Sequence, residues 1–229
     1  WPALMMVSTV MLACLIDHRD TKGLTLALNA ERTLAMLLSP YLLVCVALTA
    51  AGLIYANRVW ATDEAAFSTV DRMVTVWFLA NVCWYHTGCD FFSGLLQVMP
   101  TLRDFYISSN AVHLHPMHHP ARAYIDAVYY LEIAVQMPLC LLTYFLYLRR
   151  SPARPVAEAF VCGLHVAGTF AFYLPSLLTG ETTHPILSNL DRSIATLWLI
   201  FPTVLGVRAA RQLLSAHKHA PEPETERAT

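Results

Sequence analysis

The sequence predicts an all-α protein, a polytopic bundle of transmembrane helices that encloses an intramembrane cavity. Of its 229 residues, 56% are hydrophobic and only 14% are charged, whereas about 25% of the residues in an average soluble domain are charged. The mean hydropathy is +0.48. The apolar residues form long blocks between short charged stretches, a pattern typical of helices embedded in lipid.

Five apolar blocks reach the length of about 20 residues that a helix needs to cross a hydrocarbon core of about 30 Å. They lie at residues 33–55, 74–98, 124–148, 157–179 and 191–213. A sixth block, residues 2–16, is short for a span and is either a truncated helix or the remnant of a processed segment. Lys and Arg are more frequent on the side of the C-terminus, which predicts a cytosolic C-terminus.

The charge balance excludes nucleic acid as a partner. The 15 Lys and Arg residues stand against 16 Asp and Glu residues, which gives a formal net charge of −1. The chain therefore lacks the basic surplus that a phosphate backbone requires.

The cysteines carry no metal-binding or redox motif, because none of them forms a Cys-x-x-Cys pair. We expect all six to be small core side chains within the apolar blocks. They are Cys14, Cys45, Cys83, Cys89, Cys140 and Cys162.

Three ionisable residues lie deep in the predicted spans, where a central charge costs about 2.5–3.5 kcal/mol and therefore asks for a functional reason. They are His86, Asp90 and Glu132. On an α-helix, Ser93 and Gln97 share one face with the first two.

The next span repeats this arrangement. Glu132, Gln136 and Thr143 form one polar stripe, with Tyr129 beside it. Two polar stripes in lipid are expected to face each other or a shared cavity.

Asp90, Glu132 and Trp198 are predicted to lie at a similar depth in the membrane. Because consecutive spans run in opposite directions, Asp90 and Glu132 both lie about 12–13 Å from the same, non-cytosolic boundary, and Trp198 lies about 10 Å from it. A carboxylic acid in an apolar pocket can protonate an alkene, a second carboxylate or His86 can remove another proton, and an indole face stabilises the cation between these steps. This set of residues therefore predicts alkene isomerisation, or cyclisation if an internal alkene captures the cation.

Other candidates are weaker. The stretch from His113 to His119 has many imidazoles but no clear carboxylate or Cys complement, so we interpret it as a solvated or interfacial loop and expect no metal. His165 is interpreted equally well as a packing histidine or as a cavity residue. Asp126 lies near the boundary and is expected at the rim of the site, and His184 is most simply a helix entry.

The last span gives the most specific resemblance to a known family. Leu197-Trp198-Leu-Ile-Phe-Pro202-Thr-Val-Leu-Gly resembles the LW-x-x-x-P-x-VL run of the emopamil-binding protein family. This family is the EXPERA-domain group that includes the sterol Δ8–Δ7 isomerase and the sigma-2 receptor.

Two further segments are similar to the same family, and the resemblance covers roughly residues 74–215. Trp77-Phe78 followed by His86-x-x-x-Asp90 is similar to the family's WF…H-x-x-x-E, and Glu132 lies where the family has the glutamate of its next helix.

The resemblance implies that His86, Asp90 and Glu132 transfer protons and that Trp198 stabilises the carbocation. It also implies the endoplasmic reticulum and a four-helix EXPERA-like domain (74–215), preceded by one or two N-terminal helices (1–73). The Pro and Glu residues of the C-terminal segment 216–229 predict a disordered tail. The reaction itself needs no cofactor, because proton transfer involves no net redox change.

Two departures bear on the substrate. Asp90 replaces the family's glutamate, which shortens the acid by one methylene group, and Ala195 replaces an asparagine three residues before the tryptophan. These changes leave the proton chemistry intact and allow a terpenoid other than the family's sterol.

The sequence thus predicts an isomerase that shifts a double bond in a sterol or related terpenoid. Its predicted substrate contacts are Tyr129, Gln136, Ser93, Gln97, Ala195 and Asp126. The alternatives are a terpene cyclase and a sterol- or lipid-binding receptor or trafficking protein. A proton-coupled transporter is disfavoured, because the carboxyls cluster at one depth, and the chain could also form a homodimer.

Overall fold

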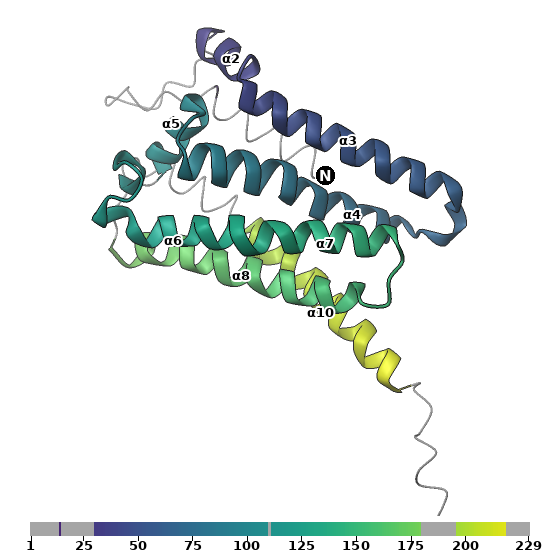
Figure 1. The fold of residues 1–229 in the computed structure, drawn as a ribbon. Helices are drawn as coiled ribbons and strands as arrows, with labels where there is room; N and C mark the ends of the chain where they lie inside the picture. The colour runs from purple at the N-terminus through teal and green to yellow at the C-terminus, as the bar shows by residue number, and fades with distance from the viewer. Residues whose placement is uncertain (1–13, 15–29, 110, 180–195, 219–229) are drawn as a thin grey trace, which may run out of the picture.

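The computed structural model describes residues 14, 30–109, 111–179 and 196–218, and every regular element in these ranges is helical. The predicted all-α class is confirmed for this part of the chain. Five long helical segments run side by side in alternating directions (Figure 1). The predicted block 2–16, apart from Cys14, lies outside the described residues. The tail was predicted to begin at 216, but residues 216–218 are helical, and the rest of the tail, 219–229, lies outside the described residues.

A proline sets the start of the first long helix. Helix α2 (Ala30–Leu37) ends just before Ser39, and α3 (Pro40–Thr62) begins with Pro40 in its first turn. Proline suits this position because its missing N–H would have no partner there. The span therefore begins seven residues later than the predicted block 33–55, which joined parts of two helices.

The second long segment consists of α4 (Thr69–Ala80) and the π-helix η2 (Asn81–Leu95), and it follows the short 3₁₀ turn η1 (Glu64–Ala66). Ser68 caps α4, because its hydroxyl accepts a hydrogen bond from the Asp71 N–H at 3.1 Å. This segment packs against α3 on one side and against α7 on the other. It is accordingly the most enclosed part of the bundle.

Short helices connect this segment to the next at one end of the bundle. They are α5 (Pro100–Ser109), η3 (Ala111–Leu114) and η4 (Pro120–Arg122). The third long segment then runs through α6 (Ala123–Leu131), the π-helix η5 (Glu132–Gln136) and α7 (Met137–Leu148).

Pro138 explains the second π-helix. Proline offers no N–H to the carbonyl four residues earlier, and its ring clashes with that carbonyl in an α-helix. The turn before Pro138 is widened, and the Met137 N–H bonds to the Glu132 carbonyl five residues back.

The bundle is completed by α8 (Arg154–Thr179) and α10 (Leu197–Lys218), which pack against each other. The C-terminal part of α10 extends beyond the other helices (Figure 1). The predicted block 191–213 is described only from residue 196 onward.

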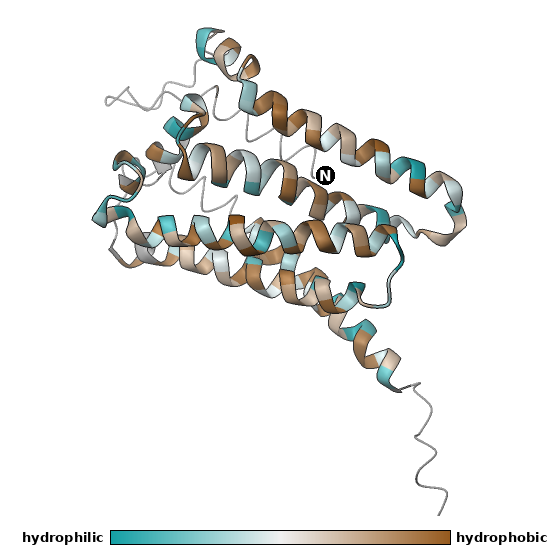
Figure 2. Cartoon of the chain, in the orientation of Figure 1, coloured by the Kyte–Doolittle hydropathy of each residue, from teal (hydrophilic) through white to brown (hydrophobic). Residues whose placement is uncertain are grey.

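Four of the described helices are long and apolar enough to cross a membrane, whereas five were expected. They are Pro40–Thr62, Pro120–Leu148, Arg154–Leu174 and Leu197–His217. The expected span that is not apolar enough is the helix Thr69–Leu95. Asn81, His86 and Asp90 interrupt its apolar sequence and lower its hydropathy. Brown apolar positions alternate with paler positions along both α3 and the α4 segment (Figure 2).

Candidate functional site

Both π-helices carry the polar residues that the sequence singles out. His86, Asp90 and Ser93 lie on η2, and Glu132 and Gln136 lie on η5. π-helical turns are rare and occur frequently at functional sites. The two π-helices contact each other, so the two polar faces meet between neighbouring helices.

His86 and Asp90 form a buried pair. The His86 Nδ1 lies 2.9 Å from the Asp90 Oδ2, as expected for residues four apart on one helix face. The imidazole is only 3% exposed and the Asp90 side chain 16%. The hydrogen bond orients the ring, so that its Nε2 faces the helices opposite.

Glu132 lies close enough to Asp90 for the two carboxyls to interact electrostatically. Its Oε2 has no hydrogen-bond partner among the residues that the structure describes. Such a buried acceptor or donor is costly unless something else pairs with it. Glu132 is therefore the side chain of this site that is best placed to meet a bound molecule.

A glycine on α8 makes room for the Glu132 face. A Cβ at Gly168 would lie 2.9 Å from the Gln136 Nε2 and 3.6 Å from the Glu132 Oε1. Gln136 is buried and donates a hydrogen bond to the Leu164 carbonyl of α8 at 3.3 Å. The amide thus fixes η5 against α8 at the level of Glu132.

Trp198 lies against aromatic side chains of the α4–η2 segment. Its ring centroid is 4.4 Å from that of Tyr85, in an edge-to-face arrangement, and 6.0 Å from that of Trp77. Tyr85 precedes His86 in the chain, so the indole approaches the helix that carries the His86–Asp90 pair. Its convergence with the carboxyls stays a prediction.

Ser93 and Gln97 have local partners. The Ser93 hydroxyl donates to the Gly88 carbonyl at 2.9 Å, a bond across the wide π turn. Gln97 lies beyond the end of η2, with a φ of 56°, and its amide donates to the carbonyls of His113 and His115 at 3.2 and 3.4 Å. The predicted polar stripe therefore ends before Gln97, because the helix ends at Leu95.

Asp126 binds the loop around His118 to the end of the bundle. The buried Arg122 donates through Nε to the Asp126 Oδ1 at 2.6 Å and through Nη2 to the Gly94 carbonyl at 2.5 Å. The other Asp126 oxygen accepts from the His118 N–H at 2.8 Å. These bonds give Asp126 a structural partner that the sequence did not predict.

The histidine-rich stretch is only partly solvated, contrary to expectation. His113 is 2% exposed, and its Nε2 lies 2.7 Å from the Tyr129 hydroxyl. Tyr129 is fully buried against Gly94. His118 and His119 are exposed, as predicted. Ala195 and His184 lie outside the described residues.

A second polar network, which the sequence analysis missed, lies at the opposite end of the bundle. Arg208 donates to the Glu158 Oε1 at 3.1 Å and to the Asp71 Oδ1 at 2.9 Å, and the Tyr147 hydroxyl donates to the Glu158 Oε2. Glu158 lies near the start of α8 and Arg208 late in the antiparallel α10. In antiparallel helices these two positions lie at the same depth in the bundle, so the sequence could have predicted the pair.

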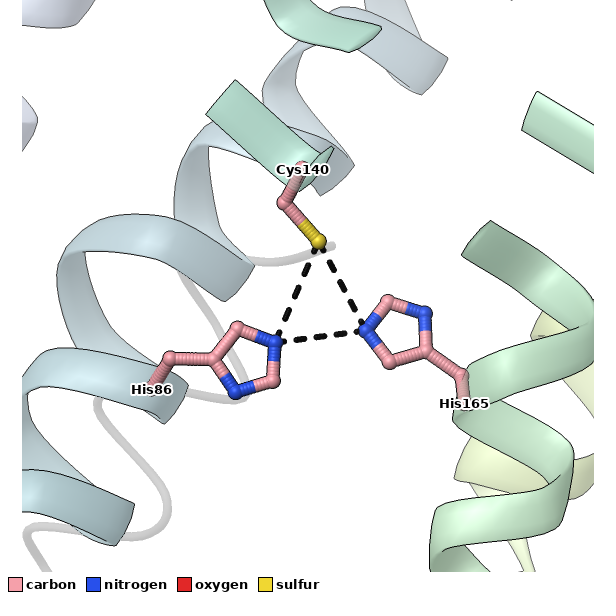
Figure 3. Close-up of side chains that lie close together, drawn as sticks. All are labelled: His86, Cys140 and His165. Atoms are coloured by element: carbon pink, nitrogen blue, oxygen red, sulfur yellow. Dashed lines mark hydrogen bonds between the residues drawn. The ribbon is translucent and has the colours of Figure 1, made fainter. Parts of the chain in front are cut away.

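The side chains of His86, Cys140 and His165 come from three helices and point toward one another (Figure 3). The His86 Nε2 lies 3.4 Å from the His165 Nε2, and the Cys140 Sγ lies 3.7 Å from the latter and 3.9 Å from the former. All three residues are buried, and their atoms could hold a metal ion. Cys140 is buried in the core, as predicted, and it also continues the stripe of Glu132 and Gln136 at a spacing of four.

Comparison with known families finds a match to just under half of the chain, which does not include His86 and Asp90. Residues 98–209 match the model of the EBP family, described as EXPERA (EXPanded EBP superfamily), so the predicted resemblance is confirmed. The matched segment contains Glu132, Cys140, His165 and Trp198. A search of curated proteins finds no match.

Proposed function

Because residues 98–209 match the EXPERA family model, we propose that the protein is an integral-membrane isomerase. Its substrate is a sterol or a related terpenoid, in which it shifts a carbon–carbon double bond. Membership of this family fits a membrane protein with a sterol isomerase-like or sterol-binding role. The single observation that carries the catalytic reading is the buried His86–Asp90 pair within electrostatic reach of Glu132.

The surroundings of the two carboxyls suggest different roles. Glu132 has an oxygen with no hydrogen-bond partner among the described residues, which suits a protonated acid that donates to a bound alkene. Asp90 is paired with His86, which suits an ionised carboxylate that accepts a proton. Two like charges at one buried site disfavour each other, so one proton shared over the pair is the expected resting state.

The reaction follows from these roles. Glu132 transfers its proton to one alkene carbon, and the positive charge develops on the other. The electron-rich rings of Trp198 and Tyr85 line the neighbouring helix face and stabilise that charge, by about 2 kcal/mol if the contact is desolvated. Asp90 then removes a proton from an adjacent carbon, and its electron pair forms the new double bond. Atoms and charge balance once Asp90 releases its proton to solvent and Glu132 takes up a proton from solvent.

The experiment that tests this function is expression in cells that lack their own sterol Δ8–Δ7 isomerase, grown in deuterated water. Neutral lipids are profiled by mass spectrometry. We expect a restored Δ7 sterol that carries one new deuterium, because the added proton comes from solvent. A product with an additional ring would instead identify a cyclase, and saturable sterol binding without any product would identify a binding protein.

Glu132→Gln is the decisive variant, because glutamine keeps the shape of the side chain but has no acidic proton. Turnover should fall by about 10²–10⁴-fold, while the amount of folded protein in the membrane stays the same. Glu64→Gln is the matched control, since the Glu64 side chain is 86% exposed. Full activity of Glu132→Gln would refute the proposal.

We further propose the endoplasmic reticulum as the membrane, on the basis of the family resemblance, and a cytosolic C-terminus, on the basis of the Lys and Arg distribution. An acceptor site for N-glycosylation placed after residue 218 should remain unmodified. The same site placed between Ala61 and Phe67, on the same predicted side, should also remain unmodified. Glycosylation at either position would overturn this orientation.

A further inference from the structure

We infer that His86, Cys140 and His165 bind a transition-metal ion, for which Zn²⁺ is the first candidate. The three residues come from η2, α7 and α8, so an ion here would link three helices of the bundle. Imidazole nitrogen and thiolate sulfur are the ligands that Zn²⁺ prefers. The inference goes beyond the proposed isomerase reaction, although the metal site shares His86 and its hydrogen-bond partner Asp90 with the residues of that reaction.

The distances match the edges of a coordination tetrahedron. With Zn–N bonds of about 2.05 Å and Zn–S bonds of about 2.3 Å, tetrahedral ligands lie about 3.4 Å apart for two nitrogens and about 3.6 Å apart for nitrogen and sulfur. The observed distances are 3.4 Å between the two Nε2 atoms and 3.7 and 3.9 Å from these to the Cys140 Sγ. An ion can therefore be placed at the centre with only small shifts of the side chains.

The surroundings of His86 supply a further element of a metal site. Its Nδ1 bonds to Asp90, which leaves Nε2 to face Cys140 and His165. A histidine ligand characteristically donates its other N–H to a carboxylate, which fixes the tautomer that offers a lone pair to the metal. Figure 3 shows both Nε2 atoms and the sulfur directed toward a common point.

Burial and charge agree with this assignment. Cys140 is 0% exposed, and the two histidines are each 3% exposed, so these ligands are shielded from competing water. A thiolate and the neighbouring Asp90 carboxylate together offset the double charge of the ion, as a site within an apolar bundle requires. A set of three protein ligands leaves a fourth position for water or another small ligand.

Metal content and cobalt spectroscopy test the inference without any measurement of turnover. The full chain is purified in detergent, its zinc is measured by mass spectrometry, and the chelator-treated protein is titrated with Co²⁺. We expect about one zinc per chain. We also expect a near-ultraviolet thiolate-to-cobalt charge-transfer band, which added Zn²⁺ removes by displacement.

Variants connect the ion to these residues. Cys140→Ala should abolish the charge-transfer band, and His165→Ala should weaken cobalt binding at least tenfold. Asp90→Asn should weaken it by about 10- to 100-fold, as is typical of the partner of a histidine ligand. Cys45→Ala is the matched control, because Cys45 is equally buried but lies on α3, outside the cluster.

Two results would overturn the inference. One is a wild-type protein that gives no thiolate band with excess Co²⁺, a result that does not depend on the folding of any variant. The other is a folded Cys140→Ala protein that keeps the wild-type band. Neither result decides the isomerase proposal, which is tested separately by the search for a shifted double bond and by the activity of Glu132→Gln.

Discussion

Residue-scale chemistry in this protein depends on a few polar side chains in an apolar bundle. His86, Asp90 and Glu132 would each be costly in the membrane interior without a partner or a function. The structure gives the first two a partner in each other and leaves a Glu132 oxygen without one among the described residues. This difference between two nearby carboxyls is the basis for assigning them opposite roles.

Asp90 can be tested with two substitutions of different severity. Asp90→Asn keeps the hydrogen-bonding shape but cannot accept the substrate proton, so turnover should fall by about 10²–10⁴-fold. Asp90→Glu keeps the charge and restores the length that the family uses, so its turnover should exceed that of Asp90→Asn. The rate of product formation in isolated membranes measures both, and equal rates for the two variants would contradict the role of the charge.

A close contact at Gly94 predicts a stability effect. A Cβ at this position would lie 2.3 Å from the Cζ of Tyr129, whose rigid ring is fully buried. Gly94→Ala should therefore destabilise the protein by about 1–3 kcal/mol, seen as a lower melting temperature in detergent. Gly163→Ala is the control, because a Cβ there meets nothing within 4 Å. Equal melting temperatures for both variants would refute the steric reason.

The residues of the site differ in how predictable they were. The His86–Asp90 contact follows from a spacing of four on one helix, because residues four apart are neighbours on one face of an α-helix and stay neighbours in the wider π turn. The approach of Cys140 and His165 depends instead on how three helices rotate against one another. The sequence of one helix does not determine that rotation, and for that reason this approach was not predicted.

At the scale of the elements, this bundle differs from one built only of α-helices by its two π-helices, η2 and η5. The apolar blocks misplaced two helix starts, at 33 instead of Pro40 and at 74 instead of Thr69, although Pro40 and the cap residue Ser68 mark these starts in the sequence. The π geometry was not predicted, because the periodicity analysis assumed α-helical turns throughout. Pro138 offers a physical cause for η5, whereas we have no comparable cause for the fifteen-residue η2.

Removal of Pro138 tests whether η5 depends on it. Pro138→Ala supplies an N–H that can bond to the carbonyl four residues back, which favours an ordinary α-helical turn. Glu132 would then rotate relative to α7, so turnover should fall at least tenfold while the melting temperature stays the same or rises. Pro202→Ala in α10 is the control for proline loss within a helix. Unchanged turnover in Pro138→Ala would show that Glu132 keeps its position without the proline.

At the scale of the whole molecule, charged networks lie at both ends of the bundle and polar chemistry lies between them. Arg122 and Asp126 hold the loop at one end, and Arg208, Glu158 and Asp71 join α10, α8 and α4 at the other. The general bundle was predictable from the apolar blocks. The pairing of these charges across helices was not, because it requires the helix order in space.

The Arg208 network predicts a large and recoverable loss of stability. Arg208→Met leaves Glu158, which is 0% exposed, without its cation, and breaking a buried pair in this way costs about 3–5 kcal/mol. The double variant Arg208→Met/Glu158→Met should recover much of this loss, because no buried charge is then left without a partner. Thermal unfolding in detergent measures the effect. Arg150→Met is the control, since its pair with Asp63 is more than half exposed and contributes about 0–1 kcal/mol.

The long π-helix η2 also affects how relatives can be aligned with this chain. Each π hydrogen bond spans one residue more than its α-helical counterpart, so an α-helical relative reaches the same depth with fewer residues. An alignment that forbids a gap between Asn81 and Leu95 would then pair His86 or Asp90 with a residue from the wrong side of the helix. Comparisons across this segment should therefore be made by spatial position, with single-residue insertions and deletions allowed inside the membrane.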